Sequence, residues 1–141
     1  MAAWLVACSG PSESEQLQSA RALLQRRETA AAVLQLKSLL LAHPDSGEGR
    51  LLLGQAYAEL GNSLGAEAEY RRAQDAGVDA LRVAPLLAEV LMEQRRAAEV
   101  IRQLAPLGGT DKPALAALKA QLALAYLSEG ELERAQAAIA E

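Results

Sequence analysis

Residues 53–73, LGQAYAELGNSLGAEAEYRRA, decide the fold. Gly54 and Ala66 are small, and they would let two antiparallel helices approach each other closely. Gly61 tolerates left-handed backbone and suits the turn between those helices. The remaining space would be filled by larger side chains at helical spacings, namely Leu53, Tyr57 and Tyr70. The stretch therefore predicts a helical hairpin, with Ala73 as a further small packing residue.

The same pattern of small and large residues recurs along the chain. A step of 34 residues toward the N-terminus reaches Ala20, Leu23, Ala32 and Leu36, and Pro44 would end that unit. A step of 34 toward the C-terminus reaches Ala88, Leu91 and Leu104. A further step of 35 reaches Ala123, Tyr126, Gly130, Ala135 and Ile139. We therefore expect four two-helix units at about 13–46, 47–80, 81–115 and 116–141, the last incomplete.

The period and the small/large pattern resemble the tetratricopeptide repeat (TPR). This resemblance covers about nine-tenths of the chain and implies an all-α fold, a right-handed α-solenoid of tandem hairpins. Unit three departs from the pattern at Pro85, which we expect in the first turn of its helix or at a kink. A loop is expected between Pro106 and Pro113. No polar capping helix follows unit four, so the array is expected to continue or to be covered by another protein.

Composition excludes several classes of function. The 141 residues are 51% hydrophobic and only 3% aromatic, which favours a globular helical protein. The net charge is −4, without the basic face of a nucleic-acid binder. The single histidine and the single cysteine are His43 and Cys8. They lie in different parts of the chain, a repeat unit and the N-terminal tail, so a Cys/His catalytic pair is not expected, and one cysteine is too few for a cysteine-based metal site. We expect no enzyme activity, cofactor, metal or small-molecule substrate.

The N-terminal residues 1–12 contain a candidate lipidation site. Leu5-Val6-Ala7-Cys8 fits the bacterial lipobox, and the Ser/Gly-rich residues after it suit a tether. No basic residue precedes Cys8, although a secretory signal needs one. Either the true start lies upstream and the signal is truncated, or the motif is accidental. Lipidation would place the protein in the Gram-negative cell envelope, facing the periplasm; otherwise it is cytoplasmic.

Four stretches, 31–45 followed by 48–61 and 85–88 followed by 100–106, together with the lipobox, resemble a narrower family. It comprises the TPR lipoproteins of exosortase/PEP-CTERM protein-sorting systems, which are long arrays associated with exopolysaccharide loci. The resemblance implies a membrane-tethered scaffold for an export or sorting system. The alternatives are a soluble cytoplasmic adaptor and an accessory repeat domain of a larger protein.

In TPR proteins the first helix of each hairpin lines a concave groove. The resemblance therefore assigns a partner-binding surface to Leu17, Arg21, Leu24, Gln25, Glu48, Leu51, Gln55, Glu59, Arg82, Glu89, Met92, Glu93, Leu124 and Leu127. Four glutamates face two arginines in this set, which disfavours a clamp for C-terminal carboxylates. We expect protein or peptide partners that are basic or neutral and partly apolar.

Overall fold

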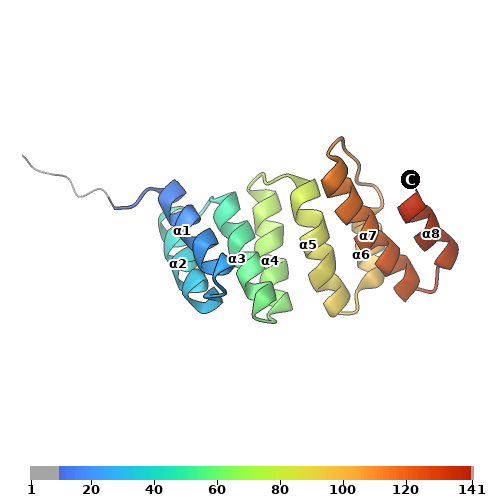
Figure 1. Cartoon of the computed structure of the whole chain (residues 1–141), viewed down its shortest axis with the longest axis horizontal. Coiled ribbons are helices and arrows are strands. Elements are labelled where there is room, and N and C mark those ends of the chain that lie inside the picture. Colours follow the sequence, from blue (N-terminus) through green and yellow to red (C-terminus); the bar gives the residue numbers. More distant parts are fainter. Residues whose placement is uncertain (1–9, 141) are drawn as a thin grey trace, which may run out of the picture.

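The computed structural model describes residues 10–140 and contains eight helices and no strand in that range. The first hairpin is α1 (Glu13–Gln25) and α2 (Thr29–Ala42), and the second is α3 (Gly47–Glu59) and α4 (Ser63–Asp75). The third is α5 (Ala80–Glu93) and α6 (Ala97–Leu104), and the fourth is α7 (Lys112–Ser128) and α8 (Leu132–Ala140). The hairpins are stacked in chain order along one axis (Figure 1). The predicted all-α solenoid of hairpins is confirmed.

Local capping residues set where the helices begin. Ser12 accepts a hydrogen bond from the Glu15 backbone N–H and Glu15 bonds back to Ser12, a capping box that starts α1. Asp111 caps α7 through the Ala114 backbone N–H. This cap starts α7 at Lys112, with Pro113 in its first turn, at the end of the predicted loop. The helix α5 begins at Ala80 after the Asp79 cap.

Pro85 lies in the second turn of α5, so the expected position in the first turn is wrong. Proline lacks an N–H, and the Leu81 carbonyl therefore receives no hydrogen bond from residue 85. The following helix, α6, ends at Leu104 before Pro106, as the prolines predict.

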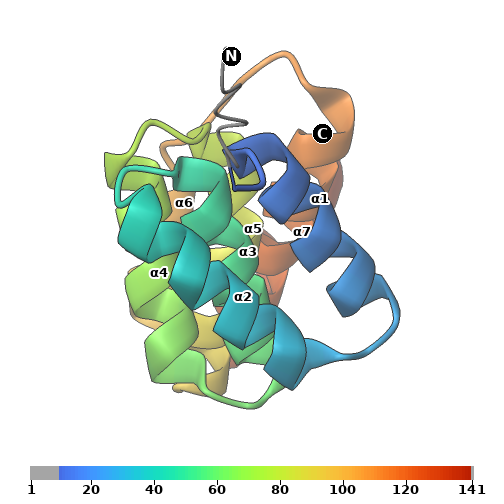
Figure 2. The same ribbon diagram turned by 90° about the vertical axis from the view of Figure 1, so that its left-hand side faces the viewer.

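The first and second helices of the hairpins occupy different sides of the array. Viewed from its end, α2, α4 and α6 lie on one side, whereas α1 and α7 lie on the other (Figure 2). The helices α1, α3, α5 and α7 contact one another in turn. Within residues 10–140, no Cα atom of α4 lies within 8 Å of a Cα atom of α2 or α6. The array is therefore tighter along its first helices, which form its inner side.

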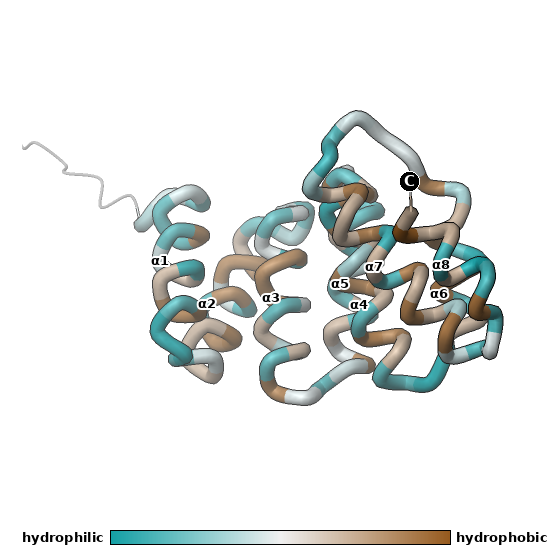
Figure 3. The backbone as a smooth tube through the Cα atoms, turned by 45° about the vertical axis from the view of Figure 1, so that its right-hand side comes forward, coloured by the Kyte–Doolittle hydropathy of each residue, from teal (hydrophilic) through white to brown (hydrophobic). Residues whose placement is uncertain are grey.

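The core lies between and within the hairpins, and the loops are polar, mostly teal or white in Figure 3. Most of the predicted repeat residues are buried: Ala20, Ala32, Leu36, Leu53, Ala66, Tyr70, Ala73, Ala88, Leu91, Ala123, Tyr126 and Ala135. Gly54 is also buried, whereas Leu23 and Tyr57 are partly buried against the core. Pro44 lies in the exposed connection between α2 and α3.

The turn inside each hairpin uses left-handed backbone at equivalent positions. Gly61 and Gly130 have φ of 73° and 79° there, as expected for glycine. The equivalent residues of hairpins one and three are Arg27 and Arg95, with φ of 63° and 59°. A side chain in this conformation strains the backbone, so two of the four turns are less favourable than they could be.

Candidate functional site

The inner side of the array carries two adjoining clefts. The first has a volume of about 480 Å³ and is lined by Leu24, Gln25, Arg27, Gln55, Ala58, Glu59, Tyr70, Leu86 and Glu89. The second, of about 310 Å³, is lined by Arg21, Leu24, Gln25, Glu48, Leu51, Leu52, Gln55 and Arg82. Leu24, Gln25 and Gln55 line both clefts, so they form one continuous surface over α1, α3 and α5.

A chain of ion pairs spans the second cleft. Glu48 of α3 accepts hydrogen bonds from Arg21 of α1 at 2.9 Å and from Arg82 of α5 at 2.6 Å. The Arg82 guanidinium, assisted by Arg21, holds the pKa of the Glu48 carboxyl below its ordinary value despite partial burial. Glu48 also raises the pKa of Arg82. Both cations of the predicted groove are thus engaged with the same carboxylate, which ties three successive hairpins together.

The first cleft is acidic. Glu59 and Glu89 line it, and together with Glu93 these carboxylates add to burial, the largest cause, in raising the pKa of the Tyr70 phenol. Glu59 and Glu93 stand at the C-terminal ends of α3 and α5, where the helix dipole is also negative. Arg27 at the rim is 3.9 Å from Glu59, and its side chain is 83% exposed.

Glu59 and Glu93 also make the same structural contact one repeat apart. The Thr29 hydroxyl, at the start of α2, donates to Glu59 at 2.8 Å. The Ser63 hydroxyl, at the start of α4, donates to Glu93. These two carboxylates therefore link hairpin one to hairpin two and hairpin two to hairpin three. Glu89 is exposed, and it makes no hydrogen bond or ion pair with another residue in the range 10–140.

The structure brings together nine of the fourteen residues assigned to the groove: Arg21, Leu24, Gln25, Glu48, Leu51, Gln55, Glu59, Arg82 and Glu89. Met92 is partly buried against the core, and Glu93 lies at the α4 junction. Leu124 and Leu127 of α7 are half exposed and line neither cleft.

The resemblance assigned Leu17 to the groove, but the structure places it in the core. It is 9% exposed and belongs to the core of hairpin one, because it stands one turn before the packing residue Ala20 on the same helix face. Leu51 has the same relation to Gly54 and is 4% exposed, so it contributes only a floor to the second cleft. Neither residue presents a side chain that a partner can surround.

Other residues of the clefts were missed by the sequence analysis, namely Arg27, Leu52, Ala58, Tyr70 and Leu86. Tyr70 was assigned to packing alone. A Cβ added to Gly54 would lie 2.5 Å from the Tyr70 ring, which shows how closely the ring crosses α3. The pairing of glycine with tyrosine at these repeat positions was the available signal that the ring reaches across its neighbour.

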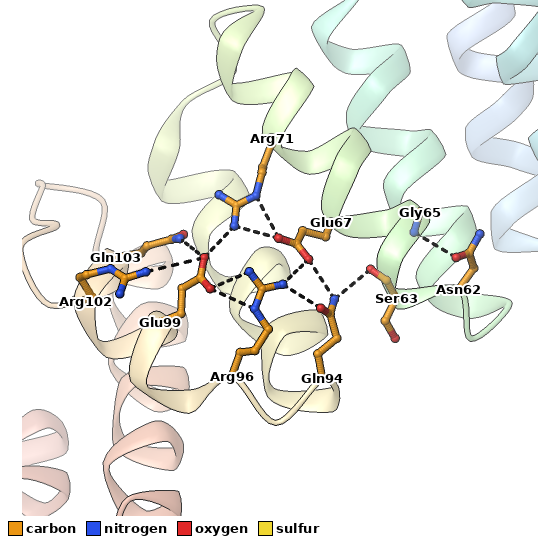
Figure 4. Close-up of polar contacts among 10 residues, drawn as sticks. All are labelled: Asn62, Ser63, Gly65, Glu67, Arg71, Gln94, Arg96, Glu99, Arg102 and Gln103. Carbon is orange, nitrogen blue, oxygen red and sulfur yellow. Dashed lines mark hydrogen bonds and ion pairs between the residues drawn. The ribbon is translucent and has the colours of Figure 1, made fainter.

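A second polar cluster lies on the side of α4 and α6 (Figure 4). Arg96 contacts Glu67 and Glu99, each at 2.6 Å, and Arg71 contacts the same two carboxylates at 2.9 and 3.0 Å. Arg96 is the main cause that lowers the pKa of Glu99, and it is supported by Arg71. For Glu67, burial is the largest influence, but hydrogen bonds from Arg71, Gln94 and Arg96 together lower its pKa. The two arginines are paired with the two glutamates, so this cluster has a structural role.

Other chemistry is limited in the described part of the chain. No group of three His, Cys, Asp or Glu side chains among residues 10–140 is arranged to hold a metal ion. None of the described helices is long and apolar enough to span a membrane. Cys8 and the lipobox at residues 5–8 lie outside the described residues.

Comparison with known proteins identifies the fold. No family model and no curated protein matches the chain. Solved structures do match: YrrB, described as a TPR protein with an unusual peptide-binding site, has a TM-score of 0.76 and 18% identity over 92% of this chain. PilF of Pseudomonas aeruginosa has a TM-score of 0.80 and 24% identity over 89%, and a double mutant of MamA has 0.77 and 19% over 92%.

The chain spans 66% of the length of YrrB, 57% of PilF and 73% of the MamA variant. At these identities the likeness establishes the fold. Residues 10–140 therefore form an array of TPR-type helical hairpins, with two clefts on its inner side.

Proposed function

We propose that this chain is a scaffold that binds a segment of a partner protein along the surface of α1, α3 and α5. The observation that carries the proposal is the continuity of the two clefts through Leu24, Gln25 and Gln55. A surface of this kind, apolar at its floor and polar at its walls, suits a helical or extended peptide. The fold it shares with YrrB, whose description names a peptide-binding site, supports the same assignment.

The charged residues of the two clefts indicate the charge of the partner segment. Arg21 and Arg82 are occupied by Glu48, whereas the first cleft presents Glu59 and Glu89. A partner segment that is basic or neutral and partly apolar matches this distribution. Apolar contacts would provide affinity, and exposed charges would mainly steer the encounter.

Selection of random twelve-residue peptides displayed on phage against the whole chain tests the scaffold proposal. Gln55 lines both clefts, so Gln55→Tyr should obstruct bound peptides and weaken them about tenfold, equivalent to about 1.4 kcal/mol. The control is Leu34→Tyr, which introduces the same side chain on α2 at a leucine that is 72% exposed. If the selected peptides bind Gln55→Tyr as tightly as the wild type but bind Leu34→Tyr more weakly, the functional surface lies on the second helices instead.

A finer part of the proposal concerns location. Leu5-Val6-Ala7-Cys8 supports attachment of the scaffold to the Gram-negative cell envelope, facing the periplasm, as a lipoprotein of a protein-sorting or export system. Stable anchoring needs more than one acyl chain, which lipoprotein processing supplies. Expressed in a Gram-negative host behind a full leader, the wild type should fractionate with membranes and Cys8→Ser should not. If wild type and Cys8→Ser are found in the membrane fraction in equal amounts, the protein is not anchored through Cys8.

A further inference from the structure

Tyr70 occupies a repeat position that is aliphatic in the other three hairpins. The equivalent residues are Leu36, Leu104 and Ile139. Tyr70 is 1% exposed, yet it lines the first cleft. Its ring passes against Gly54, where the other hairpins have alanine.

The Tyr70 hydroxyl makes no hydrogen bond with any residue in the range 10–140, and it reaches solvent, since no buried side-chain oxygen in that range lacks a partner. A ligand that covers this hydroxyl must supply a hydrogen bond, because desolvating the group without one costs free energy. Leucine at this position would offer no such group. The phenol at the floor of the cleft is therefore a hydrogen-bonding group that a bound segment can use.

The surroundings of the hydroxyl specify the charge of that ligand. Glu59, Glu89 and Glu93 act on the phenol, and Arg27 is the one cation among the residues that line the cleft. One oxygen of Glu59 is occupied by Thr29, and Glu93 is engaged by Ser63, whereas Glu89 is uncommitted within the described residues. The burial and the carboxylates that raise the pKa of Tyr70 keep its hydroxyl protonated and neutral, so it can accept a hydrogen bond from a cationic N–H.

The apolar part of the cleft specifies the shape of the ligand. Leu24, Ala58 and Leu86 lie beside the carboxylates. Lysine and arginine side chains combine an aliphatic stem with a charged head, and they bury the stem along apolar surface. An alkyl chain over these residues would bring its head to Glu89 and Tyr70.

We propose that the first cleft is a specificity pocket that takes one lysine or arginine side chain of the bound partner. The head group donates to the Glu89 carboxylate and to the Tyr70 hydroxyl, and the stem lies over Leu24, Ala58 and Leu86. Arg27, at the rim, competes with the incoming cation for Glu59. This inference rests on the proposed function, because it names the residue by which the bound segment is recognised.

The test repeats the phage selection on four forms of the whole chain: wild type, Tyr70→Phe, Tyr57→Phe and Glu89→Gln. Tyr70→Phe keeps the ring that packs against Gly54 and removes only the hydroxyl. Tyr57→Phe makes the same change at a tyrosine of the same hairpin that lines neither cleft. Wild type and Tyr57→Phe should enrich peptides with lysine or arginine at one fixed position, and the other two should lose that preference.

Calorimetry on the strongest wild-type peptide then measures the contact. Replacing its basic residue by norleucine should weaken binding to wild type about tenfold, because a hydrogen bond to a charged group is lost. Tyr70→Phe should weaken the original peptide by a similar factor, and Glu89→Gln about threefold, since exposed charges are screened. An arginine version compared with a lysine version shows which head group fits better.

The outcomes separate the two proposals. Peptides that compete for the groove without a basic preference would overturn the pocket and leave the scaffold intact. Equal binding of the lysine and norleucine peptides would also overturn it. A selection that yields no peptide sensitive to Gln55→Tyr would remove both the scaffold surface and the pocket within it.

Discussion

Hairpins two and three share a repeat period but are held together differently. In hairpin two, the Tyr70 ring of α4 packs against Gly54 of α3, and Arg50 of α3 forms an ion pair at 3.0 Å with the buried Glu69 of α4. In hairpin three, α6 has 8 residues instead of 13 and packs less extensively on its partner. Hairpin two is therefore stabilised from within.

Hairpin three is stabilised by its neighbours instead. Leu104 of α6 is 1% exposed in the core that runs from hairpin two to α7. The cluster of Glu67, Arg71, Arg96 and Glu99 connects α6 back to α4, although no Cα atoms of the two helices lie within 8 Å of each other. The stability of a repeat array is approximately the sum of contributions from contacts within each repeat and contacts between neighbouring repeats. Hairpin two relies more on the first kind of contact, and hairpin three more on the second.

The largest expected effect is at Leu104, where the dependence of hairpin three on its neighbours is greatest. Leu104→Ala should lower the free energy of unfolding by about 2–5 kcal/mol, because it removes a fully buried side chain. The matched change is Ile139→Ala at the equivalent position of α8, where the side chain is 66% exposed. That change should stay within about 0.5 kcal/mol. Urea unfolding followed by circular dichroism measures both, and equal losses would contradict the difference in burial between the two positions.

Hairpin two should be most sensitive at its closest contact. Gly54→Leu would drive atoms into the Tyr70 ring and should lower the free energy of unfolding by about 1–3 kcal/mol. Gly108→Ala is the control, since a Cβ there would meet nothing within 4 Å. An unchanged melting temperature for Gly54→Leu would mean that α3 and α4 are not held at this point.

The polar cluster between α4 and α6 should make hairpin three sensitive to acid. The pKa values of Glu67 and Glu99 are lower in the folded chain than in ordinary carboxyls. Their contribution to stability is therefore present above the ordinary value of about 4 and is lost as the pH falls through the folded values. The melting temperature of the wild type should fall between about pH 5 and pH 3, and that of Glu67→Gln should fall less. Parallel pH profiles would show that the cluster does not stabilise the array.

The smallest effect is expected at the turns. Arg95→Gly in hairpin three should raise the free energy of unfolding by less than about 1 kcal/mol, because relief of left-handed strain is partly offset by the flexibility of glycine. Gly61→Arg is the reverse change in hairpin two and should cost about 1 kcal/mol. Thermal unfolding of the pair should therefore show shifts of opposite sign. Shifts of the same sign would contradict the equivalence of the two turns.

The sequence analysis predicted the fold because packing between helices requires small and large residues at fixed spacings. Gly54, Ala66 and Tyr70 define one hairpin, and the equivalent residues define the others. The resemblance to TPR proteins assigned first-helix residues to the inner surface, where Gln55 and Glu89 lie. It erred at Leu17, because that residue lies one helical turn before Ala20 and shares the core-facing side of α1 with it.

The first cleft was beyond prediction for a different reason. Its floor is supplied by Tyr70, a residue of a second helix whose side chain crosses its neighbour, and helical periodicity does not report such crossings. The pairing of Arg21 and Arg82 with Glu48 likewise depends on side chains from three hairpins converging. The left-handed backbone at Arg27 was not predicted, because glycine is the residue usually expected in that conformation.

The inner helices α1, α3, α5 and α7 contact one another in turn, whereas no Cα atom of the outer helix α4 lies within 8 Å of one in α2 or α6. Bending of the array around a peptide seated on α1, α3 and α5 would therefore change the distance between outer helices more than the distance between inner helices. The outer helices α4 and α6 are bridged by the Glu67–Arg96 and Arg71–Glu99 contacts. Those ion pairs therefore resist separation of α4 from α6, and they would limit how tightly the inner surface can curve around a bound segment.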